Sequence, residues 1–435
     1  MKVAVIGAGW GGMAAAVHAA QAGHRVTVLE AARTLGGRAR AVPAALADGS
    51  QVLLDNGQHI LIGAYAACLT LMRTVGVNTG AALLRMPLAL RFPDGSGIAL
   101  PDAAPPWDAL AGIARARGWS LGERLALLRR AARWQLAGFS CPPGHSVADL
   151  CIGLPQRLVQ EFIDPLCVSA LNTPAQQACG QTFLRVVRDS LFAGRGGSHL
   201  LLPRTDLGAL LPEPAAAWLR ARGHAVHTGR RVQALQRDAS GPGWRVDGEP
   251  FDAVLLATSS TEAARLVGDA SAFAHEHAAL QRWATLARQL AFGAIATVYA
   301  EQPGASGPLL ASPMLALRAG PGRPAQFAFD RGQLGGPAGL LAFVISAHQG
   351  ERAALESAVL AQAAQDLALP GLRLVQTVVE KRATFVCSPG LQRPPLQVAQ
   401  GLLCCADYVA GPYPATLEGA VLHGAAAAQA LGRQG

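Results

Sequence analysis

Three glycines near the N-terminus have the spacing of a nucleotide-binding loop. Gly7, Gly9 and Gly12 follow an apolar run that predicts a buried strand, and they precede a stretch with the composition of a helix. In such a loop the first glycine permits a tight turn, the second lets the backbone approach a pyrophosphate, and the third lets the helix pack on the strand. The helix N-terminus offers free N–H groups to the phosphates. We therefore predict a dinucleotide site at these three glycines and at the adjacent Gly11.

An acidic residue supports this interpretation. Glu30 ends a second apolar run, 25–29, at the distance expected for the carboxylate of a dinucleotide-binding fold. Such a carboxylate accepts hydrogen bonds from ribose hydroxyls, so we expect an unphosphorylated ribose. Gly37 and Arg38 follow in a Gly-Gly-Arg sequence, in which the guanidinium could neutralise a pyrophosphate. The alternative for this tripeptide is a surface turn with a solvated arginine.

A second strand, acid and helix occur near the C-terminus. The apolar run 402–405 leads to Asp407, and the sequence Pro-Ala-Thr-Leu-Glu-Gly-Ala, 414–420, precedes an alanine-rich helix. The positive end of such a helix would favour an anionic group bound beside it. The alternative is an ordinary strand followed by an amphipathic helix.

Together these motifs resemble the amine oxidase and carotenoid desaturase superfamily of FAD-dependent enzymes. The resemblance implies that FAD is the cofactor and that Arg38 lies near its pyrophosphate. It implies that Asp407 meets the ribityl or pyrophosphate region, and that Thr416 and Leu417 lie at the isoalloxazine ring. The backbone of Val232 would contact adenine.

The expected fold is α/β: a discontinuous, Rossmann-like FAD-binding domain of the glutathione reductase type, with a second, mixed α+β substrate domain. The segments expected for the FAD domain are 1–62, 200–262 and 390–435, and those for the substrate domain are 63–199 and 263–389. The sequence shows no second strand, glycine loop and helix that could bind NADPH. We therefore expect electrons derived from reduced nicotinamide to arrive by a route that the sequence does not identify.

Two internal motifs resemble a narrower group. The stretch 54–65, with Gly57 and His59, and the stretch 161–174, with Asp164, are similar to those of hydroxysqualene dehydroxylases, the squalene-associated flavin enzymes of bacterial hopanoid pathways. The resemblance implies that Gly57 contacts FAD. It also implies that reduced FAD replaces the allylic hydroxyl of hydroxysqualene, an isoprenoid lipid, with hydride to give squalene and water. Such chemistry needs a dry, apolar cleft.

The leaving hydroxyl needs a proton donor. His59 titrates near neutrality, so it is a candidate acid or substrate-orienting group, although a flavin-contacting or structural role is the alternative. Asp164 could be a carboxylic acid kept protonated by burial, with a turn-forming aspartate as the alternative. We expect Glu161 to be a solvated helix residue.

Composition excludes several classes of protein. Charged residues make up 15% and hydrophobic residues 51% of the 435, so the chain is not predominantly disordered. The net charge is +9, but the basic residues are dispersed and lack interleaved stacking aromatics, so we expect no nucleic acid partner. The eight cysteines have no metal-ligand spacing, and we expect no metal. No signal peptide or long apolar run is evident, and we expect a cytoplasmic location.

The segment 107–135 raises a further expectation. It contains three tryptophans and six arginines, and its leucines recur at helical spacing. A basic amphipathic helix of this kind can lie in an anionic membrane interface, which here would be the inner face of the membrane. The alternative is an ordinary surface helix whose apolar face lies in the core.

Other functions remain open on the sequence alone. A phytoene-type carotenoid desaturase has the same fold and cofactor with the opposite direction of electron flow. An amine oxidase would need an aromatic cage, for which Tyr408 and Tyr413 are the candidates. A non-enzymatic prenyl-lipid carrier resembling the GDP-dissociation inhibitors is less consistent with the intact dinucleotide motif.

Overall fold

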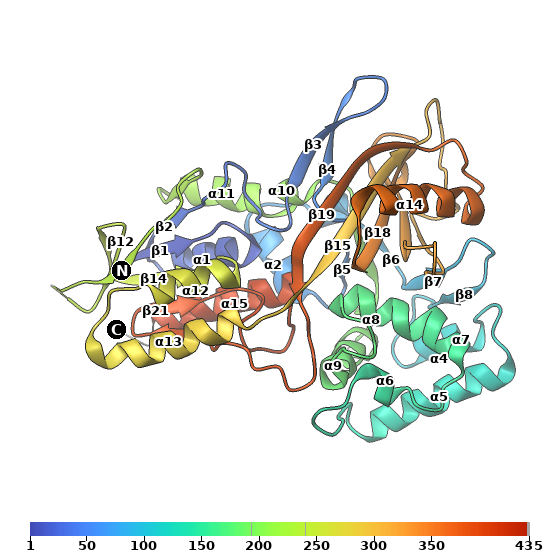
Figure 1. Ribbon diagram of the computed structural model, residues 1–435, viewed down its shortest axis with the longest axis horizontal. Coiled ribbons are helices and arrows are strands. Elements are labelled where there is room, and N and C mark those ends of the chain that lie inside the picture. The colour runs from blue at the N-terminus through green and yellow to red at the C-terminus, as the bar shows by residue number, and fades with distance from the viewer. Residues whose placement is uncertain (193, 240, 433–435) are drawn as a thin grey trace.

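The computed structural model describes residues 1–192, 194–239 and 241–432, so the last three residues of the expected C-terminal segment lie outside it. The molecule is elongated, with a mostly parallel sheet at one end and a long antiparallel sheet towards the other (Figure 1). Both termini lie at the end that contains the parallel sheet. In the described part of the chain, no helix is both long and apolar enough to cross a membrane.

A six-stranded sheet forms the cofactor half. Its strands, in order, are β10 (Ala225–His227), β2 (Arg25–Leu29), β1 (Lys2–Ile6), β14 (Ala253–Leu256), β21 (Leu402–Cys404) and β20 (Gln397–Ala399). The first five strands are parallel to one another, and β20 is antiparallel to β21. Val3 pairs with Ala253, and Val254 pairs with Leu402, so segments far apart in the sequence become neighbours. The discontinuous, Rossmann-like fold is therefore confirmed.

The β1 strand is apolar because helices and loops cover both faces of this sheet. Val3 and Val5 contribute to one core, whereas Ala4 and Ile6 contribute to the core on the opposite face, as the alternation of a strand requires. On the first face lie α1 (Trp10–Gln21), α10 (Leu207–Leu210), α11 (Pro212–Arg220), α15 (Leu417–Leu431) and α2 (Ala66–Thr74). On the second lie α12 (Ser260–Gly268), α13 (Ala274–Arg288) and the meander β11 (Leu235–Arg237), β12 (Trp244–Val246) and β13 (Glu249–Phe251).

The position of α13 differs from the expected domain division. Leu280 and Trp283 are buried in the core beneath the cofactor sheet, and the Trp283 indole N–H donates to the Pro395 carbonyl at 2.8 Å. Because α13 follows residue 262, the expected division places it in the substrate domain. Its apolar side chains nevertheless pack with segments of the cofactor half. The expected boundaries otherwise stay a prediction.

A five-stranded antiparallel sheet forms the substrate half. Its strands, in order, are β16 (Met314–Ala316), β17 (Phe327–Asp330), β18 (Leu340–His348), β15 (Phe292–Glu301) and β19 (Arg373–Phe385). The helix α14 (Arg352–Asp366) covers one face, as Figure 1 shows, and its Leu355 and Val359 lie in the core on that side. The other face packs against a separate core that extends into the helices of residues 107–191.

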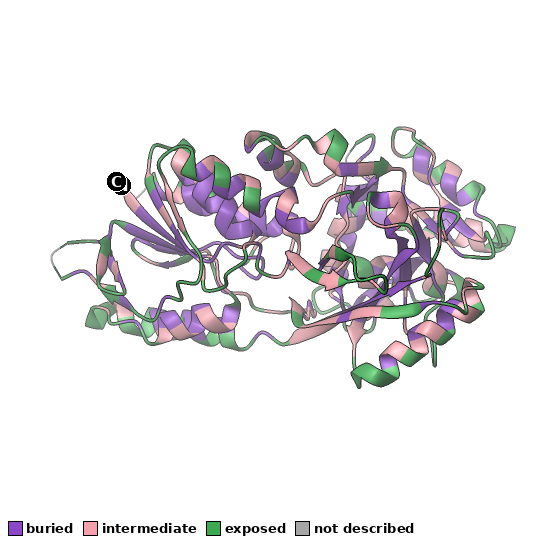
Figure 2. Ribbon diagram, turned by 90° about the horizontal axis from the view of Figure 1, so that it is seen from above, coloured by how far each residue is buried: buried purple, intermediate pink, exposed green. Residues whose placement is uncertain are grey.

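Short elements complete the structure. The strands are β3 (Ala41–Ala45), β4 (Gln51–Asp55), β5 (Leu61–Ile62), β6 (Leu83–Met86), β7 (Ala89–Arg91), β8 (Gly97–Ala99) and β9 (Leu200–Pro203). The helices are α3 (Thr79–Ala82), α4 (Trp107–Ala114), α5 (Leu121–Leu136), α6 (Val147–Leu150), α7 (Gln156–Leu158), the π-helix η1 (Val159–Ile163), α8 (Asp164–Leu171), α9 (Gly180–Leu191) and the 3-10 helix η2 (Arg331–Leu334). Figure 2 shows that the surface helices bury one side and expose the other.

The strand β9 joins the two halves. It lies between β5 and β6, and its side chains alternate between two cores. Leu201 contributes to the core of the cofactor half, whereas Leu200 and Leu202 contribute to that of the substrate half. One short strand therefore fixes the two hydrophobic cores side by side.

Candidate functional site

A cavity of about 1000 Å³ runs from the carboxyl ends of the parallel strands into the substrate half. Eleven of the expected cofactor positions line it: Gly7, Gly9, Gly11, Glu30, Gly37, Arg38, Gly57, Val232, Asp407, Thr416 and Leu417. His59 lines it as well, whereas Gly12 and Asp164 do not. Parallel sheets present ligand sites at the carboxyl ends of their strands, so the position of the cavity agrees with the fold.

The three motif glycines are required for different reasons. Gly7 has a φ of +105°, and an added Cβ would lie 2.6 Å from the Ala257 carbonyl oxygen. A Cβ on Gly12 would lie 2.0 Å from the Gly7 carbonyl oxygen, which shows how closely α1 packs on the turn. At Gly9 the nearest atom would be the Gly36 carbonyl oxygen at 3.9 Å. The protein itself does not exclude a side chain at Gly9, so the space kept clear there belongs to the cavity.

The N-terminus of α1 opens onto the cavity. The helix begins at Trp10, and Gly9 is its N-cap without a side-chain cap. The first intrahelical bond runs from the Met13 N–H to the Gly9 carbonyl at 2.9 Å. The N–H groups of the first turn are therefore left for a ligand, and the helix dipole favours an anion such as a pyrophosphate.

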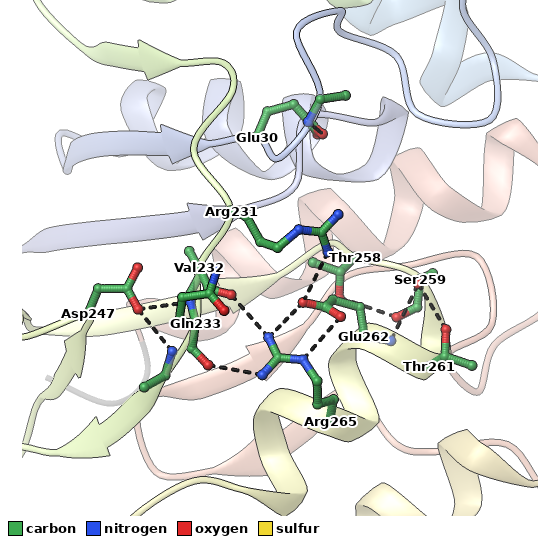
Figure 3. Close-up of polar contacts among 12 residues, drawn as sticks. Glu30, Arg231, Val232, Gln233, Asp247, Thr258, Ser259, Thr261, Glu262 and Arg265 are labelled. Carbon is green, nitrogen blue, oxygen red and sulfur yellow. Dashed lines mark hydrogen bonds and ion pairs between the residues drawn. The ribbon is translucent and has the colours of Figure 1, made fainter.

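Glu30 directly follows β2 and lines the cavity, and Figure 3 shows its side chain as sticks. Its Oε2 accepts the Ala8 N–H and its Oε1 accepts the Ala32 N–H, both at 2.7 Å. These bonds hold the carboxylate against the glycine loop. An ionised carboxylate has about four acceptor sites, so each oxygen can still accept a hydroxyl.

The backbone around Val232 is held by a side-chain network (Figure 3). The Arg265 guanidinium donates to the carbonyls of Val232 and Gln233 at 3.1 and 3.0 Å and pairs with Glu262 at 2.7 Å. The Asp247 carboxylate accepts the Gln233 N–H at 2.9 Å. Among the described residues, no partner accepts the Val232 N–H. This N–H therefore remains available to a nucleotide base in the cavity.

Arg38 and Asp407 form an ion pair inside the cavity, with the guanidinium 2.5 Å from the carboxylate. The Arg38 Nη1 also donates to the Ala383 carbonyl at 2.7 Å. Burial opposes the charge of Arg38, but the adjacent Asp407 carboxylate more than offsets it, and the pKa of Arg38 is raised above its ordinary value. The Arg38 guanidinium therefore stays protonated, and both members of the ion pair line the cavity.

His59 is held in one tautomer. Its Nδ1 lies 2.7 Å from the Gly57 carbonyl oxygen, and because a carbonyl only accepts, Nδ1 carries the hydrogen. Nε2 is then an acceptor. Burial lowers the pKa of His59; the bond to Gly57 opposes this effect, and the charge of Arg38 reinforces it. The neutral imidazole is therefore favoured near neutral pH.

The C-terminal motif contains the start of α15. Thr416 is the N-cap, and its Oγ1 accepts the Gly419 N–H at 2.9 Å, so Leu417 is the first helical residue. Glu418, in the first turn, accepts the N–H groups of Ala67 and Cys68 at 2.9 Å. This carboxylate ties α15 to the first turn of α2.

Two acidic residues of the second internal motif lie outside the lining. Burial raises the pKa of Asp164, but its side chain does not reach the cavity, so the geometry does not support it as the acid. The expectation for Glu161 is wrong. Its carboxylate accepts the Trp119 indole N–H at 3.0 Å and the Arg318 Nε at 3.1 Å, and its side chain is only 12% exposed.

Beyond the Gly57 loop the cavity becomes apolar. The side chains that line this part include Leu88, Leu90, Leu166, Ile295, Met314, Phe327, Phe329 and Val344. They come from β7, α8 and the antiparallel sheet, whose buried face turns towards the cofactor half. A nonpolar ligand could therefore lie directly beyond the cofactor positions.

Sequence reasoning missed two polar residues beside this junction. Gln58 lines the cavity; its Oε1 accepts the Arg331 Nη1 at 3.3 Å, and its buried Nε2 has no hydrogen-bond partner among the described residues. An oxygen of a bound molecule would satisfy this donor. Asp55, three residues before Gln58, is buried and has one unpartnered oxygen. The polar centre of the 54–65 motif could have indicated Gln58 and Asp55. Nothing in the sequence around Arg331 indicates that it contacts Gln58.

The donors and the open backbone of this cavity fit a dinucleotide, and comparison with known proteins indicates a flavin. Residues 10–432 match the family described as flavin containing amine oxidoreductase. The chain belongs to this family. Membership in this flavin-containing family agrees with the Rossmann-like fold, with the carboxylate at Glu30 and with the ion pair of Arg38 and Asp407.

The matches to individual relatives cover only part of this chain. The chain is 32% identical to a hydroxysqualene dehydroxylase of Rhodopseudomonas palustris over 281 residues, which cover 61% of this chain and 63% of the relative. It therefore spans less than two thirds of that protein. A hydroxyneurosporene desaturase of Rhodobacter capsulatus is 44% identical, but only over 102 residues, or 22% of this chain and 19% of the relative.

Solved structures share the fold over the whole chain. An oxidoreductase from Methanosarcina mazei superimposes with a TM-score of 0.71 at 18% identity, covering 98% of this chain and 99% of the other. At this identity the likeness concerns the architecture, which is that of a Rossmann-like domain joined to a second domain.

Proposed function

We propose that this chain is an FAD-dependent oxidoreductase that reduces hydroxysqualene to squalene, with loss of the allylic hydroxyl as water. The observation that carries the proposal is the continuity of one cavity. It begins at the dinucleotide motif, passes the Arg38–Asp407 pair and His59, and ends among apolar side chains. The similarity to hydroxysqualene dehydroxylases supports this choice among the reactions of the family.

Three features of the site indicate which flavin cofactor it holds. Glu30 retains acceptor sites for ribose hydroxyls, the N-terminus of α1 can hold a pyrophosphate, and the Val232 N–H can contact adenine. A flavin with an adenosine half uses all three features, whereas a flavin mononucleotide has no adenosine and would leave Glu30 and the Val232 N–H unused. We therefore propose FAD.

The reduction replaces a C–O bond with a C–H bond, so one hydride and one proton are consumed. Reduced FAD, when bound, supplies the hydride. The apolar walls exclude water from the reacting carbon, which protects an allylic, cation-like transition state. The His59 Nε2 can accept a hydrogen bond from the substrate hydroxyl, and the Gln58 Nε2 can donate one to the same oxygen. We assign these two residues to orientation of the leaving group. Only the imidazolium form of His59 carries a proton on Nε2, and that form is the candidate donor of the proton that leaves with the hydroxyl as water.

Membrane contact is part of the proposal. Trp107, Leu121 and Leu136, on α4 and α5, are 68%, 81% and 89% exposed. Arg124 and Arg130 cap carbonyls of neighbouring segments, but the other arginines of 107–135 carry charge at the surface. Exposed apolar and basic groups together suit an anionic bilayer, from which an isoprenoid lipid would be drawn.

An anaerobic single turnover tests the function. Photoreduced holoenzyme is mixed with hydroxysqualene, flavin reoxidation is followed by absorbance, and the lipid extract is analysed by mass. We expect reoxidation with formation of squalene. Reduced enzyme that is not reoxidised would overturn the proposal. The external donor of electrons, which we propose to derive from reduced nicotinamide, is then sought among reductants that reduce the oxidised holoenzyme.

The second candidate is an oxidative carotenoid desaturase, which the short match to the Rhodobacter capsulatus enzyme favours. It predicts that oxidised holoenzyme is reduced by a carotenoid precursor. For an amine oxidase, Tyr408 and Tyr413 both line the cavity, but the Tyr413 hydroxyl donates to Asp189 at 2.8 Å and Tyr408 is fully buried against Cys404. These contacts do not favour an aromatic cage.

A further inference from the structure

A second, smaller cavity lies within the helices of the substrate half. Its volume is about 40 Å³, and all of the side chains that line it are apolar or aromatic. They come mainly from α4, α5, α9 and the π-helix η1, which lie together at the lower right of Figure 1. We call this space the distal chamber.

The distal chamber adjoins the main cavity. Leu88, Leu166 and Leu191 line both spaces, so these three side chains form the wall between them. Leucine side chains can change rotamer without breaking a hydrogen bond, because they carry no polar group. The passage from the apolar part of the main cavity to the distal chamber therefore needs only movement of side chains.

An empty apolar chamber reduces the stability of a protein, because its lining loses packing contacts. Polar cavities of this size are filled by water, but a chamber without polar groups stays dry and accepts nonpolar molecules. The π-helix η1 contributes Phe162 and Ile163 to the lining and leads directly into α8, which carries Leu166. Single π-turns occur often at functional sites, which agrees with a role for this space.

We propose that the distal chamber is a subsite for the far end of a linear isoprenoid chain whose reacting carbon lies in the main cavity. The inference rests on the proposed function for the class of ligand. A volume of about 40 Å³ has room for about three water-sized groups, and thus for the branched end of one isoprenoid unit. Occupation of the chamber would make the enzyme selective for chain length, because only a long chain reaches both sites.

Ala131 on α5 provides the test. Its side chain lines the distal chamber, whereas the side chain of the next residue, Ala132, is exposed on the same helix. Ala131→Leu fills the chamber, and Ala132→Leu makes the same chemical change on the solvent side. Ala109→Val on α4 is a milder second filling variant, in case Ala131→Leu is overpacked.

Hydrocarbon binding to the oxidised holoenzyme tests the subsite without turnover. Squalene and a shorter isoprenoid hydrocarbon of fifteen carbons are titrated from detergent micelles, and the perturbation of flavin absorbance gives the affinity. We expect each filling variant to weaken squalene binding by about tenfold and to leave the shorter ligand unchanged. Ala132→Leu should resemble the unmodified protein with both ligands.

Two results would overturn the subsite. One is equal affinity of filled and unfilled proteins for squalene, and the other is an equal loss for both ligands, which would indicate general disruption. If unmodified holoenzyme reduces hydroxysqualene while either result holds, only the subsite is wrong. If neither ligand binds and no turnover occurs, the subsite and the proposed function are both wrong.

Discussion

Asp55 offers a quantitative test of the electrostatics beside the cavity. Its side chain is 2% exposed, its Oδ1 accepts the Leu207 N–H at 2.8 Å, and its Oδ2 has no partner among the described residues. Burial raises the pKa of Asp55 to about 6; the Leu207 N–H and the charge of Arg331 oppose the rise, and Asp206 adds to it. The substitution Asp55→Asn keeps an acceptor for Leu207 and removes the charge.

The magnitude follows from linkage. In the unfolded chain the carboxyl has its ordinary pKa of 3.8, so the folded state binds the proton more tightly. The contribution of Asp55 to stability is therefore full below pH 3.8, is lost as the pH rises towards 6, and stays lost above it. A pKa raised from 3.8 to about 6 corresponds to about 3 kcal/mol. Asparagine does not titrate, so the variant should lack this decline.

Urea unfolding, followed by tryptophan fluorescence at several pH values between 4 and 7.5, measures the effect. Between these limits the unfolding free energy of the natural protein should fall by about 2.4 kcal/mol more than that of Asp55→Asn, because the first part of the total is already lost at pH 4. Asp48→Asn, in the turn of the same hairpin, is the control. Hydrogen bonds from Ser50 lower the pKa of Asp48. Removal of the Asp48 charge should therefore not reduce the fall of the unfolding free energy with rising pH. Parallel curves for the natural protein and Asp55→Asn would refute the raised pKa of the buried Asp55 carboxyl.

Three further predictions concern the cofactor, the substrate and the membrane. Glu30→Ala should raise the dissociation constant of FAD by tenfold or more, because ribose hydroxyls and two backbone N–H groups lose their acceptor; unchanged FAD affinity in a fluorescence titration would contradict the assigned role. His59→Phe should retain FAD and lose about a hundredfold or more in hydroxysqualene turnover. If the imidazolium is the acid, turnover of the natural protein rises as the pH falls through the pKa of His59, which lies below 6.5, whereas a flat profile leaves orientation as its role. Leu121→Asp with Leu136→Asp should reduce sedimentation with vesicles that contain anionic lipid, and Leu53→Asp, another exposed leucine on β4, should not; equal binding by all three proteins would exclude α5 as the contact.

Local signals predicted the cofactor strands well. The apolar runs 2–6 and 25–29 became β1 and β2 with those bounds, since short β-branched runs between glycines leave few alternatives. The start of α1 was harder to predict. Glycines disfavour a helix locally, but α1 begins at Trp10 because its first turn packs on β21 and α15. A Cβ on Gly11 would lie 2.5 Å from the Cys405 carbonyl oxygen. Tertiary contact therefore overrides propensity there.

The residues whose environment the sequence did not predict have partners that are distant in sequence. Glu161 looks solvated until Trp119 and Arg318, 42 and 157 residues away, are seen to bind it. Asp55 takes its unusual chemistry from burial and from the Leu207 N–H, 152 residues away. Periodicity reports which face of an element is apolar, but it does not report which other element covers that face. For the same reason the distal chamber has no signature in the sequence.

The assembly of the parallel sheet from distant segments has a consequence for biosynthesis. β14 lies between β1 and β21, and β21 begins only at Leu402. At about 5–20 residues per second, the ribosome reaches that point tens of seconds after it has made β1. Until then the exposed edge of β14 and the uncovered face of α1 present apolar surface and unpaired backbone to other chains. The nascent protein is therefore exposed to aggregation while it is translated, and a flavin can be captured only after β21 has been made.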